Sequence, residues 1–271
     1  MIPGRFLSAL SRCCLALGLG WGASVTNSAH AETQTTGLVE LFEMHVGEDV
    51  DQMLFSTTFV TGDDRHGATL MVDGGGDVGP RIKEVIGHLL YTLNPQGNQQ
   101  LLIGIRQDFR DGPDLSHAAL GVSVNLGTVL SAEHYLYLSE RGNVTGSAEV
   151  VGYIKAGPAV TIEPRVSIGW APSGIRAEDT GAGFTDMAAA LRVRRQLGPV
   201  FNLYAGVIHE RLLGRTRVIA SANGDTRNTT RLIIGMGGPA SDRQSGQSAS
   251  QCRASATCSR MPVSITSSLK S

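Results

Sequence analysis

The sequence predicts an all-β protein, an antiparallel transmembrane β-barrel of about twelve strands. Three observations indicate this fold class: long segments in which apolar and polar residues alternate strictly, full charges on the polar side of those segments, and short turns that alternate with long loops. Successive strand side chains point to opposite faces, and roughly ten alternating residues can cross a membrane as a tilted strand. A soluble β-sandwich, which also alternates, is the competing interpretation.

Residues 160–170 show the alternation in its longest form. One face carries Val160, Ile162, Pro164, Val166, Ile168 and Trp170, and the other carries Thr161, Glu163, Arg165, Ser167 and Gly169. An ionised side chain is costly in a packed core unless it is paired, so a charged face fits a wet barrel interior better than a sandwich core. The same pattern recurs at 101–109, 118–128 and 186–194. These segments are longer than ordinary strands, which also favours the barrel.

Composition agrees with one β domain. The chain has 271 residues, of which 34 are glycine, and only 5% are aromatic and 17% charged. That much glycine without a collagen-like period suits many strands and turns and argues against long helices. A single barrel of this size is ordinary.

The first 31 residues have the organisation of a secretory signal peptide. Arg5 and Arg12 supply a basic region, 13–22 an apolar run, and 29–31 (AHA) a small-residue cleavage site, so cleavage is expected after about Ala31. An uncleaved anchor is the alternative, but the run is short for a spanning helix. Removal leaves 21 basic and 24 acidic residues, net −3, a balance that does not suggest a nucleic-acid partner.

Four regions follow from these patterns: a signal peptide (1–31), a short polar leader (32–37), the barrel (38–238) and a tail without periodicity that is expected to be disordered (239–271). The expected strands cover 39–46, 53–61, 68–73, 83–93, 101–109, 118–128, 133–139, 144–155, 160–170, 186–194, 201–210 and a last one from 231. The glycine run at 73–77 is expected to be a connection, and 171–184 and 212–227 are expected to be long loops.

Several ordered motifs resemble one family. They are 104–113 (GIRQDFRDGP), 118–122 (AALGV), 137–144 (YLSERGNV), 162–165 (IEPR), 183–187 (GFTDM), 191–194 (LRVR), 204–207 (YAGV) and 209–211 (HER). Together they resemble the copper resistance protein B family over roughly residues 39–236. The resemblance implies an outer-membrane barrel of Gram-negative bacteria that takes part in copper tolerance, by binding copper or by releasing or sequestering it at the cell envelope. Its implied partners are outer-membrane lipid and periplasmic copper-handling proteins.

Two departures from the family stand out. The family commonly carries a Met- and His-rich stretch between signal and barrel, whereas 32–37 holds neither residue. The family also ends on a strand that closes with an aromatic residue, whereas this sequence changes character after about Gly235. The hypothesis is a frameshifted or divergent C-terminus with an incomplete last strand. An intact alternate reading frame that encodes an aromatic-ended strand would support it.

The candidate copper ligands are few. Copper(I) prefers thioether and thiolate ligands, and imidazole serves either oxidation state. Met44, His45, His88 and His117 are the candidates, and none of them shows His-x-His or Met-x-x-Met spacing. Adjacent residues on a strand point apart, so a lipid-facing Met44 and a lumen-facing His45 is the alternative to a site at that pair.

The charges expected inside the barrel form a larger constellation. They are Arg106, Asp108, Glu133, Glu149, Glu163, Arg165, Arg192, Arg194 and Glu210. They could guide ions, or they could form a salt-bridged plug that stiffens a narrow barrel. The structural role is favoured, because side chains fill much of a small barrel.

No enzyme is expected, since the chain lacks G-x-S-x-G, H-E-x-x-H and P-loop motifs. Two other classes remain as alternatives to a copper protein. One is a general small-solute channel of the outer membrane, and the other is a soluble exported β-domain that binds a partner.

Overall fold

The structure is a computed structural model that describes residues 34–47, 50–63, 65–78, 82–93, 99–110, 112–126, 129–198 and 201–238, without the side chains of 34–38. The predicted signal peptide and tail lie outside these residues. The strands are β1 (Gln34–Gly47), β2 (Gln52–Gly62), β3 (His66–Asp77), β4 (Glu84–Leu93), β5 (Gln99–Arg110), β6 (Leu115–Leu126), β7 (Leu130–Ser139), β8 (Val144–Gly152), β9 (Ile154–Lys155), β10 (Val160–Ala171), β11 (Gly183–Gln196), β12 (Asn202–Leu212) and β13 (Asn228–Gly237).

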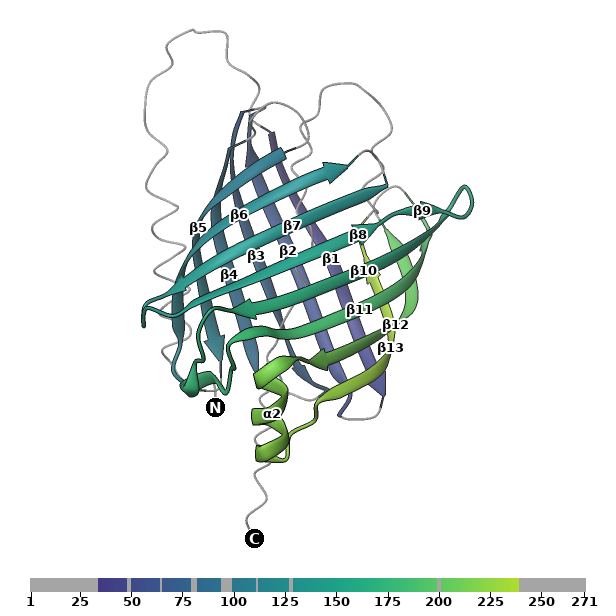
Figure 1. The fold of residues 1–271 in the computed structure, drawn as a ribbon. Coiled ribbons are helices and arrows are strands. Elements are labelled where there is room, and N and C mark those ends of the chain that lie inside the picture. Colours follow the sequence, from purple (N-terminus) through teal and green to yellow (C-terminus); the bar gives the residue numbers. More distant parts are fainter. Residues whose placement is uncertain are drawn as a thin grey trace, which may run out of the picture. The chain divides into compact units, whose positions relative to one another are not determined.

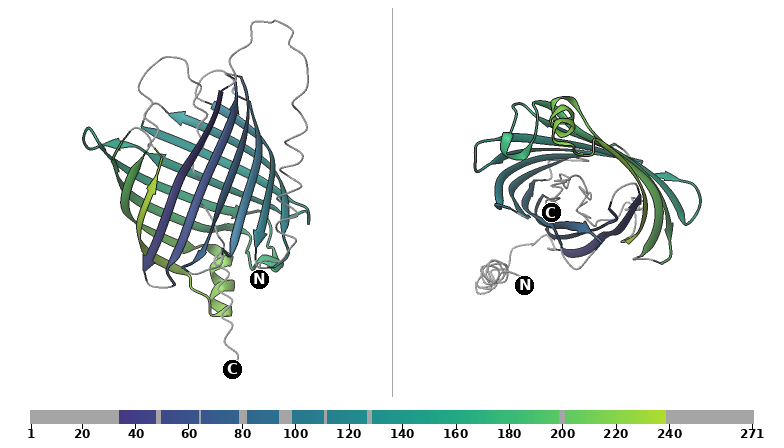
Figure 2. Two further views of the ribbon diagram at one scale, coloured as in Figure 1. Left: turned by 180° about the vertical axis from the view of Figure 1, so that it is seen from behind. Right: turned by 90° about the horizontal axis from the view of Figure 1, so that it is seen from below.

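The strands form one closed antiparallel sheet (Figure 1). Because β10 pairs with both β8 and the two-residue β9, β8 and β9 act as one strand, and each strand then pairs with its neighbour in sequence. The predicted barrel of twelve strands is therefore confirmed. Seen from below, the strands follow one another around a ring (Figure 2).

The barrel closes where the last strand meets the first. β13 pairs with β1 from Phe42↔Met236 to Gly47↔Arg231. Beyond that ladder the N–H of Gly238 donates to the carbonyl of Val39, next to a bulge at Glu40. A Cβ on Gly237 would lie 2.1 Å from the Glu40 carbonyl oxygen, so only glycine allows this approach. We name this junction of β1 and β13 the seam.

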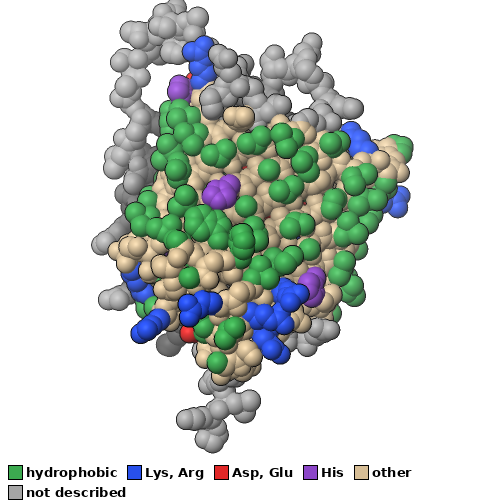
Figure 3. Space-filling view, viewed as in Figure 1, with side chains coloured by type: hydrophobic (Ala, Val, Ile, Leu, Met, Phe, Trp, Pro, Cys, Tyr) green, Lys and Arg blue, Asp and Glu red, His purple; other side chains and the backbone are tan. Residues whose placement is uncertain are grey.

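The two faces of the sheet differ as the alternation predicts. Outward side chains are mostly apolar and exposed, including Ile105 (58%), Leu232 (62%) and Ile234 (62%), and green side chains are spread widely over the face seen in Figure 3. Inward side chains are buried and include charged groups such as Arg192 (1% exposed) as well as apolar ones such as Leu90 and Ile233. An apolar exterior around an interior that holds many charges is what a barrel in lipid requires.

The two ends of the barrel differ in their connections. At the end where β1 starts, the connection between β2 and β3 is short, and Asp63 Oδ1 accepts hydrogen bonds from the backbone N–H groups of Arg65 and His66. These bonds lower the pKa of Asp63 below its usual range. The other end carries the longest connections, one with the short helix η1 (Arg176–Glu178) and one with α2 (Gly214–Asn223).

Three details differ from the sequence expectations. The 212–227 connection holds the helix α2, which ends at Gly224 with a φ of 82°, a left-handed conformation that glycine supplies readily. β1 begins at Gln34, within the expected leader, because Gln34 and the two threonines after it pair with β2. The glycine run at 74–76 continues β3 instead of turning, since both neighbouring strands pair with it.

Among the described residues, no helix is long and apolar enough to span a membrane.

Aromatic side chains cover four glycines that lie directly opposite them on the next strand. The pairs are Phe55–Gly74, Tyr135–Gly121, Trp170–Gly146 and Tyr204–Gly235. A Cβ on any of these glycines would meet the ring at 2.2 to 2.6 Å. Cross-strand neighbours are the unit of sheet stabilisation, so the glycine content of this chain is partly a packing requirement.

We expect Gly121→Ala to weaken the barrel and Gly87→Ala to leave it unchanged. The new methyl group at 121 meets the Tyr135 ring at 2.5 Å, whereas nothing lies within 4 Å of a Cβ at 87. Overpacking of this kind costs about 1–3 kcal/mol. The temperature at which the folded band disappears in a cold-to-hot SDS gel series measures the difference. Equal temperatures for both variants would contradict the packing account.

Candidate functional site: the lumen wall

Two groups of inward side chains lie on different parts of the lumen wall. The first, which we name the ion-pair network, comprises Glu43, His45, Glu149, Glu163, Arg165, Arg192, Arg194 and Asn202 on β1, β8, β10, β11 and β12. The second, which we name the His–Tyr cluster, comprises Met71, His88, Arg106, Asp108, His117, Tyr135 and Tyr137 on β3 to β7.

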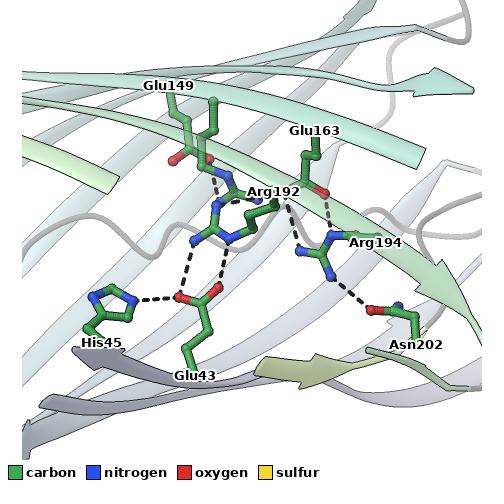
Figure 4. Close-up of polar contacts among 8 residues, drawn as sticks. Glu43, His45, Glu149, Glu163, Arg192, Arg194 and Asn202 are labelled. Carbon is green, nitrogen blue, oxygen red and sulfur yellow. Dashed lines mark hydrogen bonds and ion pairs between the residues drawn. The ribbon is translucent and has the colours of Figure 1, made fainter. Parts of the chain in front are cut away.

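Arg192 and Glu43 join β11 to β1 across the seam. Arg192 Nε donates to Glu43 Oε1 at 2.7 Å and Nη2 donates to Oε2 at 3.2 Å, a two-pronged pairing (Figure 4). His45 Nε2 lies 2.8 Å from the same Glu43 Oε2. The two strands between them present Gly206 and Gly235 inward near this contact, so no side chains of those residues block the long reach of Arg192.

Glu163 is the hub of the remaining pairs. Arg194 Nε donates to its Oε2 at 2.6 Å (Figure 4), and Arg165 Nη2 donates to its Oε1 at 3.2 Å. Arg165 Nη1 also donates to Glu149, and Arg194 Nη1 donates to Asn202, each at 3.2 Å. The network therefore ties together five strands through charge-assisted bonds, which are the stronger kind.

The network balances its own charge. Three arginines face three glutamates, and Arg194 also lies over the Tyr204 ring at 4.2 Å from its centroid. A buried charge is costly when it is unpaired, so each member depends on its partners staying in place. This arrangement suits a rigid wall better than a freely hydrated ring of charges that passes solutes.

The His–Tyr cluster has a different chemistry. Tyr135 and Tyr137 stack with their planes 7° apart, and His88 lies 6.5 Å and 6.1 Å from their ring centroids. His117 meets Tyr137 edge-on at 6.2 Å. Arg106 pairs with Asp108 at 2.6 Å and lies over Tyr137, so its charge is compensated within the cluster. This wall therefore combines imidazole, phenol and thioether groups around one compensated ion pair.

The structure separates the predicted copper ligands. Met44 faces outward and is 40% exposed, whereas His45 faces the lumen and bonds to Glu43. His88 and His117 both face the lumen within the His–Tyr cluster. Within the described residues no group of three or more His, Cys, Asp or Glu side chains is arranged to hold a metal ion.

All nine predicted lumen charges face inward, but they do not form one network. Arg106 and Asp108 belong to the His–Tyr cluster, and Glu210 pairs instead with Arg231 at 2.6 Å. Sequence reasoning missed Glu43 and Arg231. Their inward positions in alternating strands were the available signal, although alternation alone does not say which charge lies within reach of which.

The closed sheet, apolar exterior and charged interior define an outer-membrane type of β-barrel. Its fold is similar to that of the NanC porin, with a TM-score of 0.50 and 10% identity over 74% of this chain and 99% of that one. The comparison with the KdgM porin gives a TM-score of 0.46 and 11% identity, and it covers 75% of this chain and 99% of that one.

Within that class, the family model "Copper resistance protein B precursor" matches residues 33–237, and the chain belongs to this family. It is 21% identical over 191 residues to a protein described as "Copper resistance protein B homolog" of Pseudomonas syringae pv. tomato. The match covers 70% of this chain and 60% of that relative's length. Family membership supports a role in copper resistance.

We expect Arg192→Gln to destabilise the barrel by about 3–5 kcal/mol, because Glu43 loses both of its arginine bonds inside the lumen. Arg195→Gln is the matched control, since Arg195 lies on the same strand with an exposed, outward side chain. Urea unfolding in lipid vesicles, followed by Trp170 fluorescence, measures both. A control that loses as much stability as Arg192→Gln would refute the network's role.

Proposed function

We propose that this chain is an outer-membrane copper resistance protein that binds copper ions on its lumen wall and so holds or releases them at the cell envelope. The observation that carries the proposal is family membership over 33–237, a range that spans the whole described barrel. The chain would act as an exported protein in contact with outer-membrane lipid, and periplasmic copper-handling proteins are the proposed partners.

The chemistry of the lumen is compatible with this function. Copper ions bind thioether and imidazole groups, and the His–Tyr cluster offers both on adjacent strands. The ion-pair network, in contrast, offers no free ligand set, because its carboxylates are engaged by arginines. We therefore assign copper handling to the His–Tyr cluster and stiffening of the barrel to the network.

A general small-solute channel is the second candidate, favoured by one observation: charged and polar side chains face inward on many strands of the barrel. Such a channel would admit neutral solutes and would not depend on copper. The two candidates therefore differ in a growth phenotype and in a transport measurement.

We expect deletion of this protein to lower growth at raised copper concentration and to leave growth at raised zinc unchanged, with rescue by the full chain. Purified chain in vesicles is expected not to raise the uptake rate of neutral sugars. Unchanged copper tolerance after deletion would overturn the copper role. Rapid sugar uptake together with unchanged tolerance would favour the channel.

A further inference from the structure

A row of directly opposed, inward side chains crosses β3 to β6. Met71 lies opposite His88, His88 opposite Arg106, and Arg106 opposite His117. Directly opposed residues have Cβ atoms about 4.5–5.5 Å apart, within reach of one shared ion for long side chains. Met71 and His88 are thus a thioether and an imidazole on one face of the sheet, 17 positions apart in the sequence.

His88 has ring nitrogens that the protein leaves unused. It is 5% exposed, and neither Nδ1 nor Nε2 has a hydrogen-bond partner among the described residues. The nearest acid is Asp73, whose Oδ2 lies 4.0 Å from Nδ1, beyond hydrogen-bond distance. A buried imidazole normally satisfies its ring nitrogens, so this unpartnered pair is available to an ion or a water molecule in the lumen.

Met71 is equally buried, at 3% exposed, and packs with Leu90, Leu102, Tyr135 and Tyr137. Methionine is flexible enough to turn its sulfur toward His88 without moving the backbone. The apolar and aromatic neighbours would exclude water from an ion held between the two side chains.

Charge selects the oxidation state. Arg106 lies directly opposite His88, and its guanidinium, although paired with Asp108, repels a cation in proportion to that cation's charge. A monovalent ion is repelled half as much as a divalent one. Thioether sulfur also prefers the soft monovalent ion.

The geometry points to a copper(I) site formed by Met71 Sδ and a ring nitrogen of His88, with His117 on the far side of Arg106 as the next imidazole along the row. This inference rests on the proposed copper function and names the ligands and the oxidation state. It involves no electron transfer, because copper enters and leaves as the monovalent ion.

The test uses the purified full chain in detergent with its cysteines alkylated, so that thiols cannot bind the metal. Copper(I) is supplied under reducing conditions in competition with a chromogenic chelator. We expect Met71→Leu and His88→Gln each to lower copper(I) affinity by more than about tenfold, since even outer-shell changes cost that much. Met53→Leu is the control, because Met53 faces outward, opposite Met44.

X-ray absorption gives an independent readout. The copper(I)-loaded chain should show a copper–sulfur distance that Met71→Leu removes and Met53→Leu keeps. The folded band in cold SDS gels checks that each variant is still a barrel, and a variant that fails it is replaced by Met71→Ile or His88→Asn.

The outcomes separate this inference from the proposed function. The site is overturned if the folded Met71 and His88 variants both keep their copper(I) affinity, or if the copper–sulfur distance survives Met71→Leu. In that case, copper-sensitive growth of the deletion strain still supports the proposed function. Loss of binding in both variants, with the Met53 control unchanged, supports the site even if the growth phenotype is absent.

Discussion

The structure depends first on one constraint: within lipid, every backbone N–H and C=O must find its partner inside the protein. A sheet meets this requirement only when it has no edge, which makes the β1–β13 seam as necessary as any of the hairpins. Near the seam, β1 has a bulge at Glu40 in its pairing with β2, and Gly237 lies close to the Glu40 backbone, yet backbone hydrogen bonding across the seam continues to Gly238. The glycines opposite aromatic rings serve the same constraint. A large ring packs over a glycine on the next strand, so the two strands can keep their register and their backbone hydrogen bonds.

Closure brings together charges that are distant in sequence, and the lumen divides into two chemically different walls. Around β8, β10, β11, β12 and β1, arginines and glutamates neutralise one another through short bonds, and such a wall gains rigidity but keeps few groups free for a ligand. Around β3 to β7, one ion pair is surrounded by imidazole, phenol and thioether groups. Both ring nitrogens of His88 have no hydrogen-bond partner among the described residues. A barrel of twelve strands can thus separate a mechanical role from a chemical one without any added domain.

Much of this architecture could be predicted from the sequence because strand alternation is a local property. Alternation of side chains between the two faces of a strand predicts the strand at 160–170. It also predicts that Glu163 and Arg165 face inward and that Met44 faces outward. What alternation cannot give is register across strands. Glu43 and Arg192 are 149 positions apart and meet only because the barrel closes with a particular offset, and Met71 faces His88 only because the β3–β4 turn fixes their pairing. The helix α2 was missed for another reason: its Arg- and Ala-containing stretch lies between strands and has little apolar periodicity to reveal it.

The Glu43–Arg192 bond also has a kinetic meaning. Every strand pairing except the seam joins neighbours in sequence and can form as a local hairpin, whereas the seam must bring the two ends of the barrel chain together. Contacts of high sequence separation form slowly, because the entropy of closing the loop is lost before the contact is gained. We therefore infer that β1 and β13 meet last, with Glu43 and Arg192 fastening the junction from inside. Until that moment both strands are open edges, and the order of assembly decides how long the chain is exposed to pairing with the wrong partner.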